Sequence, residues 1–428
     1  MIRSISLCFV ISVFLTWSAD GVQSSDIVYR SLIAPSETVR FREIQRLSND
    51  TQRLTQYLDS VAEAIEMHGA ESIADRPPEA STVAAFELIG KLKTNASEQT
   101  LQKFLGGDHP ELSMLAVGQL GHHRYLGSIA RIAQLDRTSF YLERYAYRFA
   151  VVRALIEMNH ADANDVLLRL RGRLDGQLRY HVDTFLEGRS VDDFGGDSER
   201  FDRFLERLSE QDQEEFRNRS GAAITADAQN TSGFFSEASG EPESLQRMRL
   251  KPQKYYGIEI HSKRLLFILD HSGSMKDPWY GMTRLARAKG ELNKAIRELP
   301  GDVEFGIVCF HTRVHQWQED LVEATEANKD LAIDFVNRLG YGDRTNTYGV
   351  LRVALDYDKD LEAIYLLTDG KPTIGQFVSH QSILRDILHR NRFRHLNLNT
   401  IGIAVDGFTR EFLKRLADES GGEFRDAR

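Results

Sequence analysis

The chain of 428 residues has little cysteine, and this limits the kind of protein that it can be. Its two cysteines are Cys8, near the start, and Cys309, close to the end of the sequence. Small domains that lack a large core depend on several disulfides, so this count excludes a disulfide framework. A chain of this length can instead bury two or three hydrophobic cores.

An excess of positive charge is also missing. Asp and Glu number 63 against 54 for Lys and Arg, which gives a formal net charge of -9. Proteins that bind nucleic acids or anionic membranes usually carry a concentrated basic surface. We therefore expect neither kind of partner.

Long apolar runs are absent after the first twenty residues. Arg3, the apolar run Ile5 to Trp17 and the small residues "SADG" predict a secretory signal over residues 1–21, with an uncleaved anchor as the alternative. The run is shorter than the ~20 residues that cross a membrane. An exported chain with one remaining thiol, Cys309, is typical of a bacterial envelope or secreted protein.

Residues 30–190 have helical periodicity. Apolar stripes recur at intervals of roughly 30 to 36 residues, which favours HEAT-like helical repeats over a plain helical bundle. We expect a charged helix and a flexible linker in residues 191–254, with the linker beginning at Arg219. The stripes include Val83, Phe86 and Ile89; Leu112, Leu115 and Leu120; and Val152, Leu155 and Ile156.

Residues 255–428 alternate between strand and helix patterns. Strand-length apolar runs alternate with amphipathic helices, which predicts an α/β fold with a doubly wound, mostly parallel sheet. The predicted strands are Leu265 to Leu269, Phe305 to Phe310, Ile364 to Leu367 and Leu396 to Val405, with strands also expected at "YYGIEIHSK" and "GEFRDA".

Polar side chains follow two of these strands. Asp270, Ser272 and Ser274 come after the first strand, and Asp369 comes after the strand at Ile364. Thr345 lies in a glycine-bearing loop between them. Ligands of open parallel sheets bind beyond the carboxyl ends of the strands, so we expect these five residues to meet there.

Oxygen donors of this kind suit a hard divalent cation, with Mg²⁺ favoured over Mn²⁺ or Ca²⁺. Hydroxyl ligands are neutral and would leave the ion able to attract a carboxylate from outside. The segment "CFHTRVHQW" offers Cys309, His311 and His315 for zinc, but a fourth ligand is missing, and we expect an ordinary hairpin there. Trp279 and Tyr280 either anchor a partner or pack under the loop.

The motifs "DHSGSM" from Asp270, "GDRTNTYGVL" and "LLTDGKP" together resemble the metal-ion-dependent adhesion site of a von Willebrand factor type A domain. The resemblance implies that the hydroxyls of Ser272, Ser274 and Thr345 bind the ion. Asp270 and Asp369 would act through water or orient the hydroxyls, and a partner's Asp or Glu would complete the coordination. Many relatives have two glycines before the threonine, where this chain has Asp343 and Arg344.

These observations predict an exported, metal-dependent protein-binding module on a helical scaffold, without enzymatic activity. A metal-dependent hydrolase or phosphatase is the alternative, but it requires a general base or a second metal that the motifs do not supply. A structural domain that the ion merely rigidifies is the third possibility.

Overall fold

The computed structural model describes residues 27–69, 77–227 and 253–427. The chain forms two compact units, residues 1–103 and 104–428. The predicted signal, residues 1–21, lies outside the described residues. Within the described part, no helix has both the length and the apolar character needed to span a membrane.

The first unit is helical in its described residues. Side-chain caps define several helix starts: Asp50 accepts a hydrogen bond from the Arg53 amide, and Thr94 and Ser97 form a capping box. The interior contains fully buried residues such as Leu47 and Phe86. The helices are α2 (Glu37–Ser48), α3 (Thr51–Gln56), α4 (Leu58–Gly69), α5 (Ala80–Lys91) and α6 (Asn95–Gln102).

The second unit begins with further helices, so the region before the linker is all-helical, as its periodicity predicts. Helices α7 and α10 approach closely at Gly121, where no side chain separates them. A β-carbon on this glycine would lie 2.5 Å from the Ala154 Cα. The assignment to HEAT-like repeats stays a prediction. The helices are α7 (Pro110–His122), α8 (Ile129–Ile132), α9 (Ser139–Glu143), α10 (Tyr145–Met158), α11 (Ala161–Arg171), α12 (Gly176–Glu187) and α13 (Ser198–Asp227).

Helix α13 is longer than the sequence pattern indicates. It continues to Asp227, past Arg219, where we expected a flexible linker to begin. Amphipathic spacing before Arg219 predicted the first half of the helix, whereas the Gly, Ser and Ala content after it suggested loop. Residues 228–252, the rest of the expected linker, lie outside the described residues.

The second unit also contains a seven-stranded mixed sheet, in the order β11-β10-β9-β3-β6-β7, with β8 paired to β6. Five strands are parallel, and β7 and β8 run antiparallel to β6. This confirms the predicted α/β fold with a mostly parallel sheet. The strands are β3 (Arg264–Asp270), β6 (Glu304–Phe310), β7 (Val314–Gln316), β8 (Val322–Glu323), β9 (Ala363–Thr368), β10 (Asn397–Ile403) and β11 (Phe424–Ala427).

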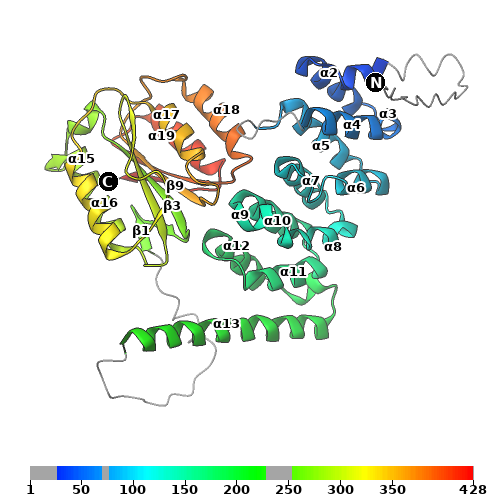
Figure 1. Cartoon of the computed structure of the whole chain (residues 1–428), viewed down its shortest axis with the longest axis horizontal. Helices are drawn as coiled ribbons and strands as arrows, with labels where there is room; N and C mark the ends of the chain where they lie inside the picture. The colour runs from blue at the N-terminus through cyan, green and yellow to red at the C-terminus, as the bar shows by residue number, and fades with distance from the viewer. Residues whose placement is uncertain (1–26, 70–76, 228–252, 428) are drawn as a thin grey trace, which may run out of the picture. The chain divides into compact units, whose positions relative to one another are not determined.

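Helices cover both faces of this sheet (Figure 1). Alternate residues of β3 point to opposite faces, and because both faces are covered the strand is apolar at nearly every position. The odd-numbered residues Leu265, Phe267 and Leu269 join one hydrophobic core. One face carries α15 (Arg284–Glu298) and α16 (Glu326–Arg338), and the other carries α17 (Thr347–Leu355), α18 (His380–Asn391) and α19 (Gly407–Asp418).

Two small antiparallel hairpins flank the sheet. The lead-in segment "YYGIEIHSK" forms part of the first, in which β1 (Gln253–Tyr255) pairs with β2 (Ile258–Ile260). The second pairs β4 (Pro278–Trp279) with β5 (Met282–Thr283). The second hairpin leads directly into α15 and thereby lies beside the loop that carries the two serines.

Candidate functional site

The candidate site begins at the ends of the two central strands. β3 ends at Asp270 and β9 at Thr368, and the strands run parallel with Leu269 opposite Leu367. The Thr368 hydroxyl therefore reaches Asp270 and donates a hydrogen bond of 2.6 Å to its Oδ2. Asp369 follows Thr368, so both carboxylates stand where the parallel strands end, which we call the C-terminal edge of the sheet.

The two serines connect these carboxylates. The Ser272 amide donates to Asp270 Oδ1 at 2.8 Å, which turns the chain into a short 3₁₀ helix, Gly273–Lys276. The Ser274 hydroxyl then donates to Asp369 Oδ1 at 2.8 Å, and the hydroxyl oxygens of Ser272 and Ser274 lie 3.3 Å apart. One loop thus contacts the ends of both strands.

The threonine loop is held against the serine loop by backbone hydrogen bonds. The Gly273 amide donates to the Asp343 carbonyl at 2.9 Å, and the Gly342 amide donates to the His271 carbonyl at 2.7 Å. The Thr345 amide is held separately, by the Thr373 hydroxyl at 2.8 Å. The side chains of Asp343 and Arg344 are exposed, and neither residue has a positive φ. The loop therefore accommodates these two residues in place of glycines, because it is anchored through its main chain.

Gly370 shows how closely the loops converge. A β-carbon on this glycine would lie 3.5 Å from the Ser274 hydroxyl oxygen and 3.7 Å from the Thr345 hydroxyl oxygen. Together with the contacts of Asp270 and Asp369, this brings all five residues singled out in the sequence to one place. The donors are two carboxylates and three hydroxyls, a set that fits a hard divalent cation.

The electrostatics of the site also favour a cation. Asp270 is fully buried and Asp369 is nearly so. Burial, and next the negative charge of Asp369, raise the pKa of Asp270 to about 7, although hydrogen bonds from Thr368 and Ser272 oppose the shift. A positive ion between the loops would stabilise both carboxylates in their charged form.

Arg284 is a functional candidate that the sequence did not reveal. Its Nη1 lies 2.7 Å from Asp369 Oδ2, and Asp277 lies 3.6 Å from the same nitrogen. Arg284 is the first residue of α15, which Thr283 caps. Arg284 and Arg287 both fall in the first turn of this helix, so nothing in the spacing distinguished one from the other. Arg284 supplies one positive charge beside the carboxylates of Asp369 and Asp277.

The residues that could suggest zinc lie on β6 and in the hairpin that follows it. Cys309 is buried on β6 and joins the hydrophobic core, and burial raises the pKa of its thiol. It pairs with His315 across the β6–β7 hairpin, and the rings of His311 and His315 stack with centroids 5.5 Å apart. In residues 27–69, 77–227 and 253–427, no three His, Cys, Asp or Glu side chains are grouped to hold a metal.

Trp279 and Tyr280 have different environments. Trp279 packs against the hydrophobic core, whereas Tyr280 is 76% exposed at the tip of the β4–β5 hairpin. Met282 and Tyr341 are exposed nearby, and the Tyr341 hydroxyl donates to the Thr283 hydroxyl at 3.1 Å. Trp279 therefore packs under the hairpin, whereas Tyr280 is available at the surface to contact a partner.

Comparison with known proteins concerns this C-terminal part of the chain. Residues 263–426 match the family model of the von Willebrand factor type A domain. Inter-alpha-trypsin inhibitor heavy chain H1 of Mesocricetus auratus is 34% identical over 151 residues, which cover 32% of this chain and 16% of the relative. Von Willebrand factor A domain-containing protein 3A of Homo sapiens is 31% identical over 185 residues, which cover 42% and 15%.

The chain spans less than a fifth of the length of these curated relatives. Among solved structures, the von Willebrand factor type A protein from Catenulispora acidiphila is 22% identical and covers 40% of each chain, with a TM-score of 0.34.

The buried carboxylate of Asp270 predicts a pH dependence of stability in the presence of chelator. The folded chain holds this proton more tightly than the unfolded chain, so the free energy of unfolding should fall as the pH rises from about 4 through about 7. Asp270→Asn should remove the share of this decrease that Asp270 contributes, ~4 kcal/mol at most. The slope should become smaller and not vanish, because the pKa of Glu362 is also raised to about 7. Denaturant unfolding at pH 5 and pH 8 measures the difference. Asp334→Asn, at an exposed carboxylate on α16, is the control and should keep the wild-type slope. A wild-type slope in Asp270→Asn would contradict the raised pKa of Asp270.

Proposed function

Since residues 263–426 form a von Willebrand factor type A domain, as their motifs predict, we propose that this protein binds other proteins through a divalent cation. The observation that carries the proposal is the convergence of Ser274 and Thr345 on Gly370, beside the buried Asp270 and Asp369. In this proposal the module is exported, through the signal expected in residues 1–21, and the helical region serves as its scaffold.

The residues would divide the work as the family resemblance implies. The hydroxyls of Ser272, Ser274 and Thr345 would bind the ion, with Mg²⁺ favoured, and Asp270 and Asp369 would hold water and orient the serines. Three neutral ligands leave much of the ion's charge uncompensated. The bound cation would therefore attract an Asp or Glu side chain of a partner protein.

The surface beside the site supports a protein partner. Tyr280, Met282 and Tyr341 are each about half or more exposed on the hairpin and loop next to the serines. Exposed aromatic residues often anchor protein interfaces. A partner could thus present a carboxylate to the ion while its apolar side chains cover these residues.

No catalytic step is part of the proposal. Binding through an ion requires neither a general base nor a second metal, whereas metal-dependent hydrolysis requires one of them. No contact in the described part of the chain favours the hydrolase alternative over binding.

Loss of one hydroxyl should remove cation binding. We expect Ser272→Ala to weaken Mg²⁺ or Mn²⁺ binding by at least about 100-fold, because loss of even an outer-shell partner of a metal weakens binding 10- to 100-fold. The fold should persist, since the partners described for the Ser272 hydroxyl, Ser274 and Asp270, belong to this site and not to the hydrophobic core. Calorimetric titration of the full chain measures this. Ser382→Ala, at a partly exposed serine of α18, is the matched control; equal affinity in both variants would refute the assignment of Ser272.

Removal of the Arg284 charge should have the opposite effect. Its guanidinium is bound to Asp369 and would repel a cation in the same site. We expect Arg284→Gln to tighten Mg²⁺ binding by about tenfold or more, and to lower the melting temperature in chelator because Asp369 loses its partner. Lys276→Gln removes the same charge from an exposed position of the serine loop and should change neither quantity. Equal Mg²⁺ affinity in Arg284→Gln and wild type would disprove this role, whereas absence of binding in both would reject the proposed function.

Partner capture should depend on the cation. The immobilised full chain should retain a partner from extracellular or envelope extract in Mg²⁺ and release it in EDTA, and Ser272→Ala should retain none. Ser382→Ala should behave as wild type. A partner that stays bound in EDTA would favour a structural role for the ion instead.

A further inference from the structure

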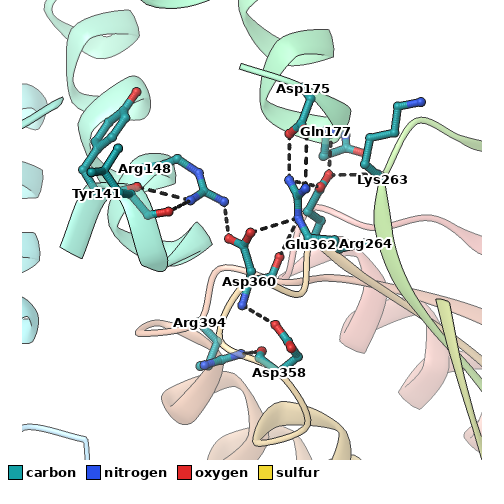
Figure 2. Close-up of polar contacts among 11 residues, drawn as sticks. Tyr141, Arg148, Asp175, Gln177, Lys263, Arg264, Asp358, Asp360, Glu362 and Arg394 are labelled. Carbon is teal, nitrogen blue, oxygen red and sulfur yellow. Dashed lines mark hydrogen bonds and ion pairs between the residues drawn. The ribbon is translucent and has the colours of Figure 1, made fainter. Parts of the chain in front are cut away.

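The opposite end of the two central strands also carries charged residues, and they contact the helices (Figure 2). Arg264 begins β3 and Glu362 directly precedes β9, at what we call the N-terminal edge of the sheet. Arg264 Nη2 lies 2.7 Å from Glu362 Oε1. Helices α10 and α12, which belong to the same compact unit as the sheet, face this pair.

Glu362 binds the start of helix α12. Its Oε2 accepts a hydrogen bond of 2.7 Å from the Gln177 amide, a residue 185 positions away in the chain, and a longer one of 3.3 Å from the Lys263 amide. The first amides of a helix lack partners within the helix, and the helix dipole favours a negative charge there. Glu362 is fully buried, so the contact excludes water.

Gly176 allows this close approach. Its φ is +55°, and a β-carbon at this position would lie 2.2 Å from Glu362 Oε2 and 2.6 Å from Oε1. Any other residue would therefore both strain the backbone and collide with the carboxylate. Because Gly176 has no side chain, the first residue of α12 can lie against Glu362, just before the start of β9.

Ion pairs surround this contact. Arg264 Nη2 lies 2.7 Å from Asp175 Oδ1 beside α12, and Arg264 Nε lies 3.1 Å from Asp360 Oδ2. Arg148 of α10 also contacts Asp360. With Glu362, this makes three carboxylates and two guanidinium groups. Asp175 and Arg148 come from the helical side and the others from the sheet side, so each side supplies charges that the other requires.

We propose that the N-terminal edge of the sheet is an interaction surface whose partner is this chain's own helical segment, α10 to α12, locked by Glu362 at Gly176. The proposal goes beyond cation-dependent binding and does not depend on a metal. The helical segment occupies the end of the sheet away from Asp270 and Asp369, and the C-terminal edge is left for an external partner.

Hydrogen exchange on the full chain tests the proposal. Gly176→Ala should raise the exchange rates at residues 176–180 and 260–264 by at least tenfold, because the added methyl group separates α12 from Glu362. Exchange in β10 should stay slow, which would show that the sheet remains folded. Unchanged exchange at both places, or loss of protection in β10, would overturn the proposal.

Two further variants separate collision from backbone strain. Gly195→Ala also places alanine at a positive φ, +70°, but no atom lies within 4 Å of the new β-carbon, so α12 should stay protected. In a Glu362→Ala background, Gly176→Ala should add only the effect of backbone strain at its positive φ, which is smaller than its effect in the wild type, since the colliding carboxylate is gone. Fully additive effects of the two substitutions would contradict the lock.

Discussion

Two neighbouring parallel strands, β3 and β9, impose the constraint on which the described architecture of the C-terminal part depends. Both are buried on both faces, so their residues are apolar and charged residues are confined to the ends. β3 runs from Arg264 to Asp270, and β9 runs between Glu362 and Asp369. The pair therefore presents one cluster of charged residues at each end of the sheet. Groups outside the sheet must compensate the charge of each cluster.

The two ends are compensated in different ways. At the N-terminal edge, Glu362 meets Arg264 and the amides at the start of α12, all supplied by this chain. At the C-terminal edge, Arg284 is the cation described against Asp369, and Asp270 accepts hydrogen bonds from the neutral Thr368 hydroxyl and Ser272 amide. Burial raises the pKa of both Glu362 and Asp270 to about 7, so the difference between the ends lies in their partners. One end is thus satisfied by docking within the chain. The other end has a surplus of negative oxygen, which is the physical reason to propose a cation there.

Sequence reasoning predicted the α/β fold and the meeting of Asp270, Ser272, Ser274, Thr345 and Asp369, because apolar runs and the rule for parallel strand ends fix both. Their role as metal ligands stays a prediction. The lock between Gly176 and Glu362 was not predictable in this way: a glycine at a helix start has an ordinary appearance, and its partner lies more than 180 residues away. Arg284 was missed for a similar reason, since only the folded chain places it against Asp369. The length of α13 was underestimated because small residues after Arg219 are typical of loops.

The strands also determine what docking can do for the proposed binding site. Six residues of β9 at ~3.3 Å each separate the two ends by ~20 Å. A short strand that is paired on both sides and buried on both faces has one arrangement, whereas coupling between distant sites requires an element with two. Docking at Glu362 is therefore expected to orient the C-terminal edge relative to helices α10 to α12, and not to change its affinity for a cation. The helical segment thus fixes the direction in which Asp270, Asp369 and the serine loop face a partner.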